Sequence, residues 1–247
     1  MPQLDWRIFW QENADFEQPY WQLLLEGLAW TLAISCAAWL IALILGVIVG
    51  ALRTAPNRPL AILAGAYTEL FRNIPLLVQM FLWYFVVPEL IPPFKAWIVQ
   101  ADIATAQFLS AVICLGLFTS ARIAEQVRSG IQSLPRGQTY AAQAIGLSTS
   151  ARYRHVLLPQ ALRMVIPPLT NETMNLIKNS SVALTIGLAE LTSRAREMGE
   201  YTFKYFEAFT AATLIYIVIG LAANRLMAWA ERRSAVPGLI AANRGGQ

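Results

Sequence analysis

The stretch YAAQAIGLSTSARYRHVLLP, residues 140–159, decides how the chain is read, because it is polar and basic yet lies between long apolar segments. Ala141 and Ala142 are small, and Gly146 follows one turn later. Small residues at this spacing allow another surface to approach a short helix closely. Gly146 can also end that helix in a left-handed cap. We therefore expect a short helix that stops at Gly146.

A second short helix is predicted directly after this glycine. Ser148 and Thr149 each offer an N-cap for it. Its solvated side is expected to carry three basic residues, Arg152, Arg154 and His155. Pro159 is expected to close the unit. The sequence thus predicts a helix–glycine–helix unit that docks a soluble partner, which we call the docking element (residues 140–159). The simpler alternative is an amphipathic loop helix.

The composition places this element in a membrane protein. Of the 247 residues, 56% are hydrophobic and 14% are charged, whereas charged residues make up about 25% of an ordinary soluble domain. Residues 32–49 are almost wholly apolar, and about 20 such residues cross a bilayer. Gly46 and Gly50 in this run predict close helix packing within the chain. We expect an all-α, polytopic membrane protein.

Five transmembrane helices are predicted, followed by their connections and termini. The spans are expected at about residues 22–52, 59–88, 107–127, 166–190 and 208–230. Residues 22–232 then form one membrane domain, residues 1–21 an interfacial arm rich in aromatic residues, and residues 233–247 a tail. Residues 128–165 form the loop that holds the docking element, and residues 88–106 and 191–207 are further connections.

Arginine placement sets the predicted orientation. The net charge is +4, and most arginines lie in loops, so we interpret them as orientation signals and expect no nucleic-acid partner. Short loops rich in Lys and Arg face the cytoplasm. The following arginines lie on one side of the five spans: Arg53, Arg58, Arg128, Arg136, Arg152, Arg154, Arg163, Arg232 and Arg233. This puts the docking element and the C-terminus inside and the N-terminus outside.

The second span carries charged residues at membrane depth. Glu69 and Arg72 are three residues apart, so they share a helix face and are expected to pair. Pro75 is expected to kink the helix. Charged side chains within spans often line a transport path, so both are candidates for such a path. The alternative is an ion pair that only fixes the helix.

The fourth span has a polar stripe on an otherwise apolar helix. Its members are Asn171, Asn175, Lys178 and Thr185, with Ser181 beside them. Glu172 belongs to a flanking row, and Arg122 is a further cation near the end of the third span. A polar stripe in a membrane faces protein or water, so it either lines a path or joins helices by hydrogen bonds. Lys178 either attracts an anionic substrate or pairs with Glu172 or Glu69.

Chemical motifs of enzymes and ATPases are not recognisable in the sequence. We find no CxxC, HExxH or Walker-type lysine loop. The one histidine, His155, lies in the docking element, and Cys36 and Cys114 lie in apolar runs as packing residues. We therefore expect no enzyme activity, no metal and no cofactor bound by this chain. A secondary transporter driven by an ion gradient is an alternative, but it leaves the docking element unexplained.

The docking element resembles the cytoplasmic coupling helix of ATP-binding-cassette (ABC) importer permeases. The match is Ala-Ala, three residues, Gly, nine residues, an aliphatic residue, one residue and Leu-Pro, and its positions are Ala141, Ala142, Gly146, Val156, Leu158 and Pro159. Tyr140 stands where the family has a leading Glu, so the resemblance does not extend to a charged contact there. The runs ELFRNIPLLVQ, LPRGQ and ETMNLIKNSSVALTIGL resemble the polar-amino-acid branch, most of all glutamate/aspartate importer permeases.

This resemblance implies a function and a set of partners. The chain would be a permease of the bacterial inner membrane, with the arm and residues 191–207 in the periplasm. ATP would be hydrolysed at a separate ATPase subunit that docks on Tyr140, Ala141, Ala142, Gly146 and Pro159. A second, related permease would complete a heterodimer, and a periplasmic binding protein would deliver the amino acid. Glutamate or aspartate is the expected substrate, and another polar amino acid such as glutamine is the alternative.

Overall fold

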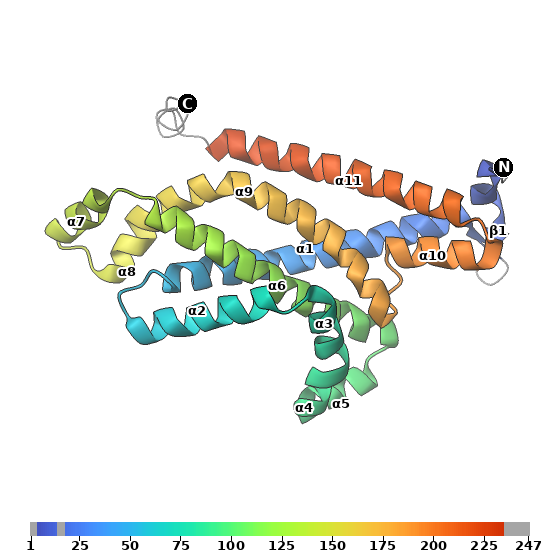
Figure 1. Ribbon diagram of the computed structural model, residues 1–247, viewed down its shortest axis with the longest axis horizontal. Coiled ribbons are helices and arrows are strands. Elements are labelled where there is room, and N and C mark those ends of the chain that lie inside the picture. Colours follow the sequence, from blue (N-terminus) through green and yellow to red (C-terminus); the bar gives the residue numbers. More distant parts are fainter. Residues whose placement is uncertain (1–3, 14–17, 235–247) are drawn as a thin grey trace.

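The computed structural model describes residues 4–13 and 18–234. The regular secondary structure of these residues is helical apart from one pair of two-residue strands. The predicted all-α class is therefore confirmed, and Figure 1 shows the long helices lying side by side. The elements are η1 (Trp6–Trp10), β1 (Glu12–Asn13), β2 (Gln18–Pro19), α1 (Tyr20–Leu52), α2 (Arg58–Asn73), α3 (Leu76–Phe81), η2 (Leu82–Val86), α4 (Val87–Leu90), α5 (Pro92–Gln100), α6 (Ile103–Gln132), α7 (Arg136–Ala144), α8 (Thr149–Arg152), η3 (Tyr153–Leu157), α9 (Leu158–Asn179), η4 (Ser180–Ile186), α10 (Leu191–Thr202) and α11 (Tyr205–Ser234).

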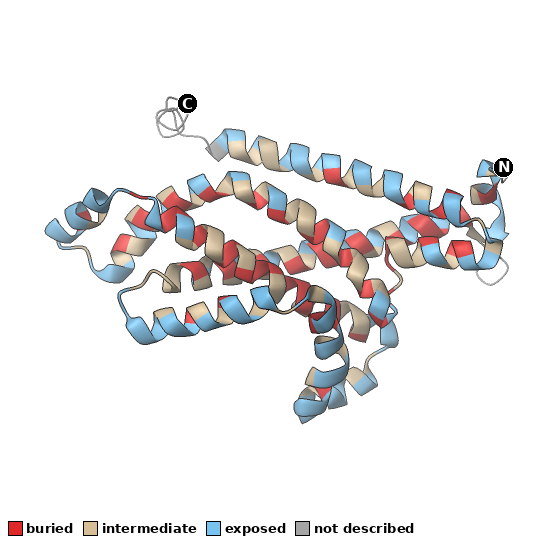
Figure 2. Cartoon of the chain, viewed as in Figure 1, coloured by how far each residue is buried: buried red, intermediate tan, exposed pale blue. Residues whose placement is uncertain are grey.

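Helices α1 and α6 form the most extensive helix pair and the centre of the core. A Cβ atom on Gly46 would lie 2.6 Å from the Cβ of Ile123, and one on Gly50 would lie 2.6 Å from the carbonyl oxygen of Ala124. No side chain fits at either position, so these glycines let α1 lie directly on α6. The close intramolecular packing predicted from their spacing is confirmed. Figure 2 shows the buried residues gathered where α1, α6 and α9 meet.

The second predicted span is broken, not kinked. Helix α2 ends at Asn73, Ile74 is extended at φ −88° and ψ 130°, and Pro75 precedes α3. The helices on the two sides of the break meet at 104°. A residue before proline disfavours the α conformation, which explains the stop at Ile74. The amide of Gln79 donates to the carbonyl oxygens of Phe71 at 2.8 Å and Ile74 at 2.9 Å, so the broken end has partners.

The fourth predicted span also differs from one uniform helix. Helix α9 begins at Leu158, eight residues before the predicted start at 166, and passes into the 3-10 segment η4 at Ser180. Gly187, with φ 87°, ends that segment. Among the described residues, α1, α6 and α11 are long and apolar enough to cross a membrane, and the bent pair Arg58–Asn73 with Leu76–Leu90 gives a fourth candidate. The count of five spans stays a prediction.

The connections between spans are more helical than the sequence predicted. Residues 88–106, predicted as a loop, contain α5 and the start of α6, and residues 191–207 contain α10. Thr105 donates its hydroxyl at 2.6 Å and its backbone N–H at 2.8 Å to Asp102 at the start of α6. These bonds hold the pKa of Asp102 below its ordinary value. Capping of this kind fixes where α6 begins.

The N-terminal arm folds back onto the start of α11. The backbone N–H of Asp5 donates to the carboxylate of Glu207 at 2.9 Å, and Ile8 packs in one cluster with Leu23 and Ala208. This end of the bundle also holds α10 and the start of α1 (Figure 1). Helices α7 and α8 and the last turns of α11 lie at the opposite end of the long axis. The predicted docking element is thus separated from the arm by the length of the spans.

Candidate functional site

The docking element contains the predicted left-handed cap. Gly146 has φ 78°, and its N–H donates to the carbonyl of Gln143 at 2.9 Å. The N–H of Leu147 donates to the carbonyl of Ala142 at 3.1 Å. These two bonds form a Schellman motif, which satisfies the last carbonyls of α7. A glycine tolerates this conformation at no steric cost, so Gly146 has a defined backbone role.

The second half of the element begins as predicted but does not end as predicted. The backbone N–H of Ala151 donates to Ser148 Oγ at 3.3 Å, so Ser148 is the N-cap of α8. Pro159 does not close the unit, because the chain stays helical from α8 through the π segment η3 into α9. The N–H of Leu158 bonds to the carbonyl of Tyr153, five residues back. Pro159 itself has no N–H to donate and lies in the first turn of α9, directly after this π turn.

The exposed surface of the element is formed by one side of α7 and its cap. Tyr140 is 62% exposed and Ile145 is 77% exposed, and Ala141 is exposed between them. A Cβ atom on Gly146 would meet nothing within 4 Å. Ala142 differs, since it is only 3% exposed, so it supports the fold of the element and does not present a free surface. A partner would therefore meet Tyr140, Ala141, Ile145 and Gly146.

Arg152 corrects the prediction that all three basic residues are solvated. Arg154 and His155 are exposed, but Arg152 is 7% exposed. Its Nε atom has no hydrogen-bond partner among the described residues. Arg152 is the last residue of α8, and the helical chain continues from it through η3 into α9. Its burial places it on the side of this stretch that packs against the rest of the chain.

The polar stripe extends across the junction of α9 and η4. Asn171, Lys178 and Thr185 are exposed, and Asn175 is half-buried. No ion pair involves Lys178 within the part of the chain that the structure describes. Ser181, half-buried beside it, donates its hydroxyl to the Lys178 carbonyl at 2.7 Å. The stripe therefore offers a free ammonium group and two amides on one side of the chain.

Glu172 is directed away from this stripe toward α6. It is 5% exposed, and Arg122 pairs with it through Nε at 2.7 Å, while the amide of Gln126 donates to it at 3.0 Å. This pair contradicts the interpretation that Glu172 neutralises Lys178. Arg122 also lies over the ring of Phe118, 6.0 Å from its centroid. Arg122 and Glu172 thus join α6 to α9.

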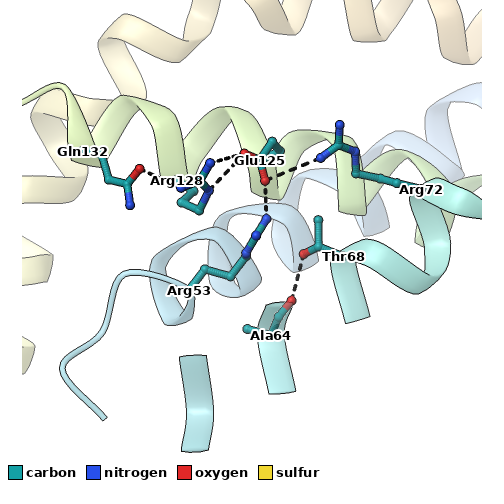
Figure 3. A network of polar contacts seen from close by, with 7 residues as sticks. All are labelled: Arg53, Ala64, Thr68, Arg72, Glu125, Arg128 and Gln132. Atoms are coloured by element: carbon teal, nitrogen blue, oxygen red, sulfur yellow. Dashed lines mark hydrogen bonds and ion pairs between the residues drawn. The ribbon is translucent and has the colours of Figure 1, made fainter. Parts of the chain in front are cut away.

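The predicted Glu69–Arg72 pair is not formed. Glu69 is exposed and has no ion pair within residues 4–13 and 18–234, whereas Arg72 lies 3.6 Å from the carboxylate of Glu125 on α6. Figure 3 shows that Glu125 also accepts from Arg53 at the end of α1 and from Arg128 on its own helix. Spacing within one helix suggested the wrong partner, because the acid that Arg72 contacts lies 53 residues further along the chain.

Three groups are therefore assembled by the fold. The docking element lies at one end of the bundle, the polar stripe lies on α9 and η4, and the Glu125 cluster lies between α1, α2 and α6. Sequence reasoning did not identify the cluster formed by Arg53, Glu125 and Arg128. Charged residues at the ends of apolar helix segments could have indicated it. An unpaired charge is costly there, so such residues are expected to pair with one another.

Comparison with known proteins shows that the chain is similar to transport permeases. A family model described as "Binding-protein-dependent transport system inner membrane component" matches residues 42–236. The glutamate/aspartate import permease protein GltJ of Escherichia coli (strain K12) is 46% identical over 239 residues, which cover 95% of this chain and 96% of that protein. The arginine transport system permease protein ArtQ of Bacillus subtilis (strain 168) is 36% identical over 85% of this chain and 92% of its own.

The fold is also similar to that of a solved transporter structure. The crystal structure of an amino acid ABC transporter with histidines contains a chain that superposes with a TM-score of 0.70 at 30% identity. The match covers 87% of this chain and 95% of that chain.

Proposed function

Because the chain belongs to the family of binding-protein-dependent transport system inner membrane components, we propose that it is the permease subunit of an ATP-driven importer for glutamate and aspartate. The observation that carries the substrate class is the likeness to a glutamate/aspartate import permease, which extends over nearly the whole of both chains. The arginine permease shares less identity over a shorter stretch. As a permease component, the chain is a multi-pass inner-membrane protein and not an enzyme, and ATP is hydrolysed by another subunit.

The partners follow from this role. The docking element is the surface on which the ATPase sits, and its free Tyr140, Ala141, Ile145 and Gly146 side would face that subunit. Opposite ends of the bundle hold the docking element and the N-terminal arm (Figure 1), which supports a cytoplasmic docking element and a periplasmic N-terminus. A glutamate/aspartate import permease protein named GltK is 32% identical to this chain, and a second permease of that kind would complete a heterodimer.

The translocation path is proposed along the polar stripe of α9 and η4. Its exposed members Asn171, Lys178 and Thr185 would face the cavity between the two permeases. An unpaired ammonium group in a membrane is costly unless water or an anion is near. The carboxylates of an acidic amino acid would supply that anion during passage. Lys178 is thus the residue that we expect to favour glutamate and aspartate over neutral amino acids.

Reconstitution of the complete importer tests this function. The permease, its partner permease, the ATPase and the binding protein would be placed in proteoliposomes, and uptake of labelled glutamate, aspartate, glutamine and arginine measured with and without ATP. We expect ATP-dependent uptake of the two acidic amino acids. Preference for glutamine or arginine would refute the substrate class alone. Uptake driven by an ion gradient without the ATPase would refute the importer and favour a secondary transporter.

A further inference from the structure

The docking element and the α1–α2 turn line the two sides of an open groove. The groove has a volume of about 960 Å³ and is bordered by residues of the turn and by residues of α8 and α9. Its walls are mainly apolar and include Ala51, Pro56 and Leu60 on one side and Leu158 and Leu162 on the other. Ala51 on one wall and Leu158 and Leu162 on the other pack against the same buried apolar cluster. A direct polar bond between the walls adds to this shared packing.

Tyr153 provides such a bond. It lies in the π segment η3 of the docking element and lines the groove, and its hydroxyl donates to the carbonyl of Thr54 at 2.6 Å. The same hydroxyl is 3.0 Å from Thr54 Oγ1. Thr54 is in the α1–α2 turn, 99 residues away in sequence. A displacement of the docking element would thus act directly on Thr54 through this hydrogen bond.

The residue before Thr54 continues the contacts into the bundle. The guanidinium of Arg53 pairs with Glu125 Oε2, and the guanidinium of Arg72 lies 3.6 Å from the same oxygen (Figure 3). Glu125 Oε1 is occupied by Arg128, one turn along α6. Arg128 therefore orients the carboxylate, and the other oxygen joins the end of α1 to the end of α2.

Arg72 is the last link because of where α2 stops. It is followed by Asn73, the final residue of α2, and then by Pro75 and the 104° break. Tyr153, Thr54, Arg53, Glu125 and Arg72 thus form one line of contacts from the docking element to the break in the second span. We infer that Glu125 is a positioning residue that transmits movement of the docking element to this break. The inference rests on the proposed function, in which that element carries the ATPase.

Among the residues of this line of contacts, Glu125 is the one at which we expect a loss of charge to have the largest effect. One carboxylate holds three guanidinium groups that come from α1, α2 and α6. Removing its charge would leave three cations close together, and like charges repel. Arg53 and Arg72 would then separate, and the α1–α2 turn would move independently of α2. ATP hydrolysis would continue at the docked ATPase while less of it drives transport.

The test measures ATP hydrolysed per amino acid transported in the reconstituted importer. Glu125→Gln should raise this ratio about threefold or more, while the thermal unfolding midpoint of the complex stays close to that of the wild type. Tyr153→Phe removes only the hydroxyl and should raise the ratio in the same direction. The double variant should add little to Glu125→Gln, because two residues in one line of contacts are not additive. The matched control is Glu89→Gln, which removes a carboxylate from an exposed pair with Lys95 at 2.5 Å.

Several outcomes would overturn the inference. An unchanged ratio for Glu125→Gln in an assembled complex would do so, as would a lowered unfolding midpoint without a change in the ratio, which indicates a structural role alone. Fully additive effects of Glu125→Gln and Tyr153→Phe would show two separate routes. If Glu125→Gln does not assemble, Tyr153→Phe decides by itself. The proposed function fails separately, if the wild-type complex shows no ATP-dependent uptake of glutamate or aspartate, and that result depends on neither variant.

Discussion

Substitution of Gly146 separates the backbone role of this residue from its role at the docking surface. Gly146→Ala and Gly146→Arg both place a Cβ atom at φ 78°. Neither Cβ atom meets a steric clash within the chain, because nothing lies within 4 Å of that position. The two variants therefore carry the same intrinsic backbone cost, and any difference between them arises from bulk that a docked partner would meet.

The magnitude of the shared cost follows from the left-handed conformation. A residue with a Cβ atom loses about 1–2 kcal/mol there relative to glycine, so each variant should weaken the Schellman cap by about fivefold to thirtyfold. This penalty is local and small beside the packing of the long helices. We expect both variants to accumulate in the membrane. Gly146→Ala should retain part of its ATPase and its uptake, whereas Gly146→Arg should lose both.

The assay is co-purification of the ATPase with the permease, followed by ATP-driven uptake in proteoliposomes. Gln143→Arg is the matched control, since Gln143 is exposed on α7 but lies about 160° around the helix from Ala141. It should keep its ATPase. If Gly146→Arg retains as much ATPase and uptake as Gly146→Ala, bulk at this position is irrelevant and the docking argument is wrong.

Three further predictions concern topology, substrate and stability. A cysteine at Ser150, in a chain whose Cys36 and Cys114 have been replaced, should resist a membrane-impermeant thiol reagent in intact cells, and ready labelling would reverse the orientation. Lys178→Gln should lower uptake of acidic amino acids while assembly and basal ATP hydrolysis stay intact; normal uptake by an assembled complex would assign selectivity to the binding protein. Glu172→Ala should lower the free energy of unfolding by about 2 kcal/mol, because its two charged or polar partners on α6 lose their acceptor, and an unchanged thermal midpoint would contradict this.

Local chemistry explains which parts of the site were predictable. The cap at Gly146 and the N-cap at Ser148 depend on residues within one or two turns, and both were confirmed. The position of Arg152 was wrong because its burial depends on what α8 packs against. Periodicity assigns a side chain to a face of a helix, but it does not say whether that face meets solvent.

The same distinction applies to the fold. Hydrophobic runs located α1, α6 and α11, but α6 and α11 extend several residues beyond the predicted spans 107–127 and 208–230 at both ends. The break at Pro75 was foreseen only as a kink, because proline chemistry fixes the place of an interruption but not its angle. The pairing of Arg72 with Glu125 needed the contact between α2 and α6. Spacing favoured Glu69 instead, and an i,i+3 pair stabilises a helix by only about 0.2–0.5 kcal/mol, so tertiary packing prevails.

The π segment η3 affects how the side chains of α9 are rotated about the helix axis relative to those of α8. A π-type hydrogen bond joins residues five apart, whereas an α-type bond joins residues four apart, so a π segment inserts one extra residue, and each residue advances a helix by about 100°. The side chains of α9, including the stripe with Lys178, are therefore rotated relative to those of α8 by the extra residue between Tyr153 and Leu157. Deleting one residue there would turn the two surfaces out of alignment without removing any of their side chains. The orientation of the docking element relative to the polar stripe thus depends on the length of this segment as well as on its composition.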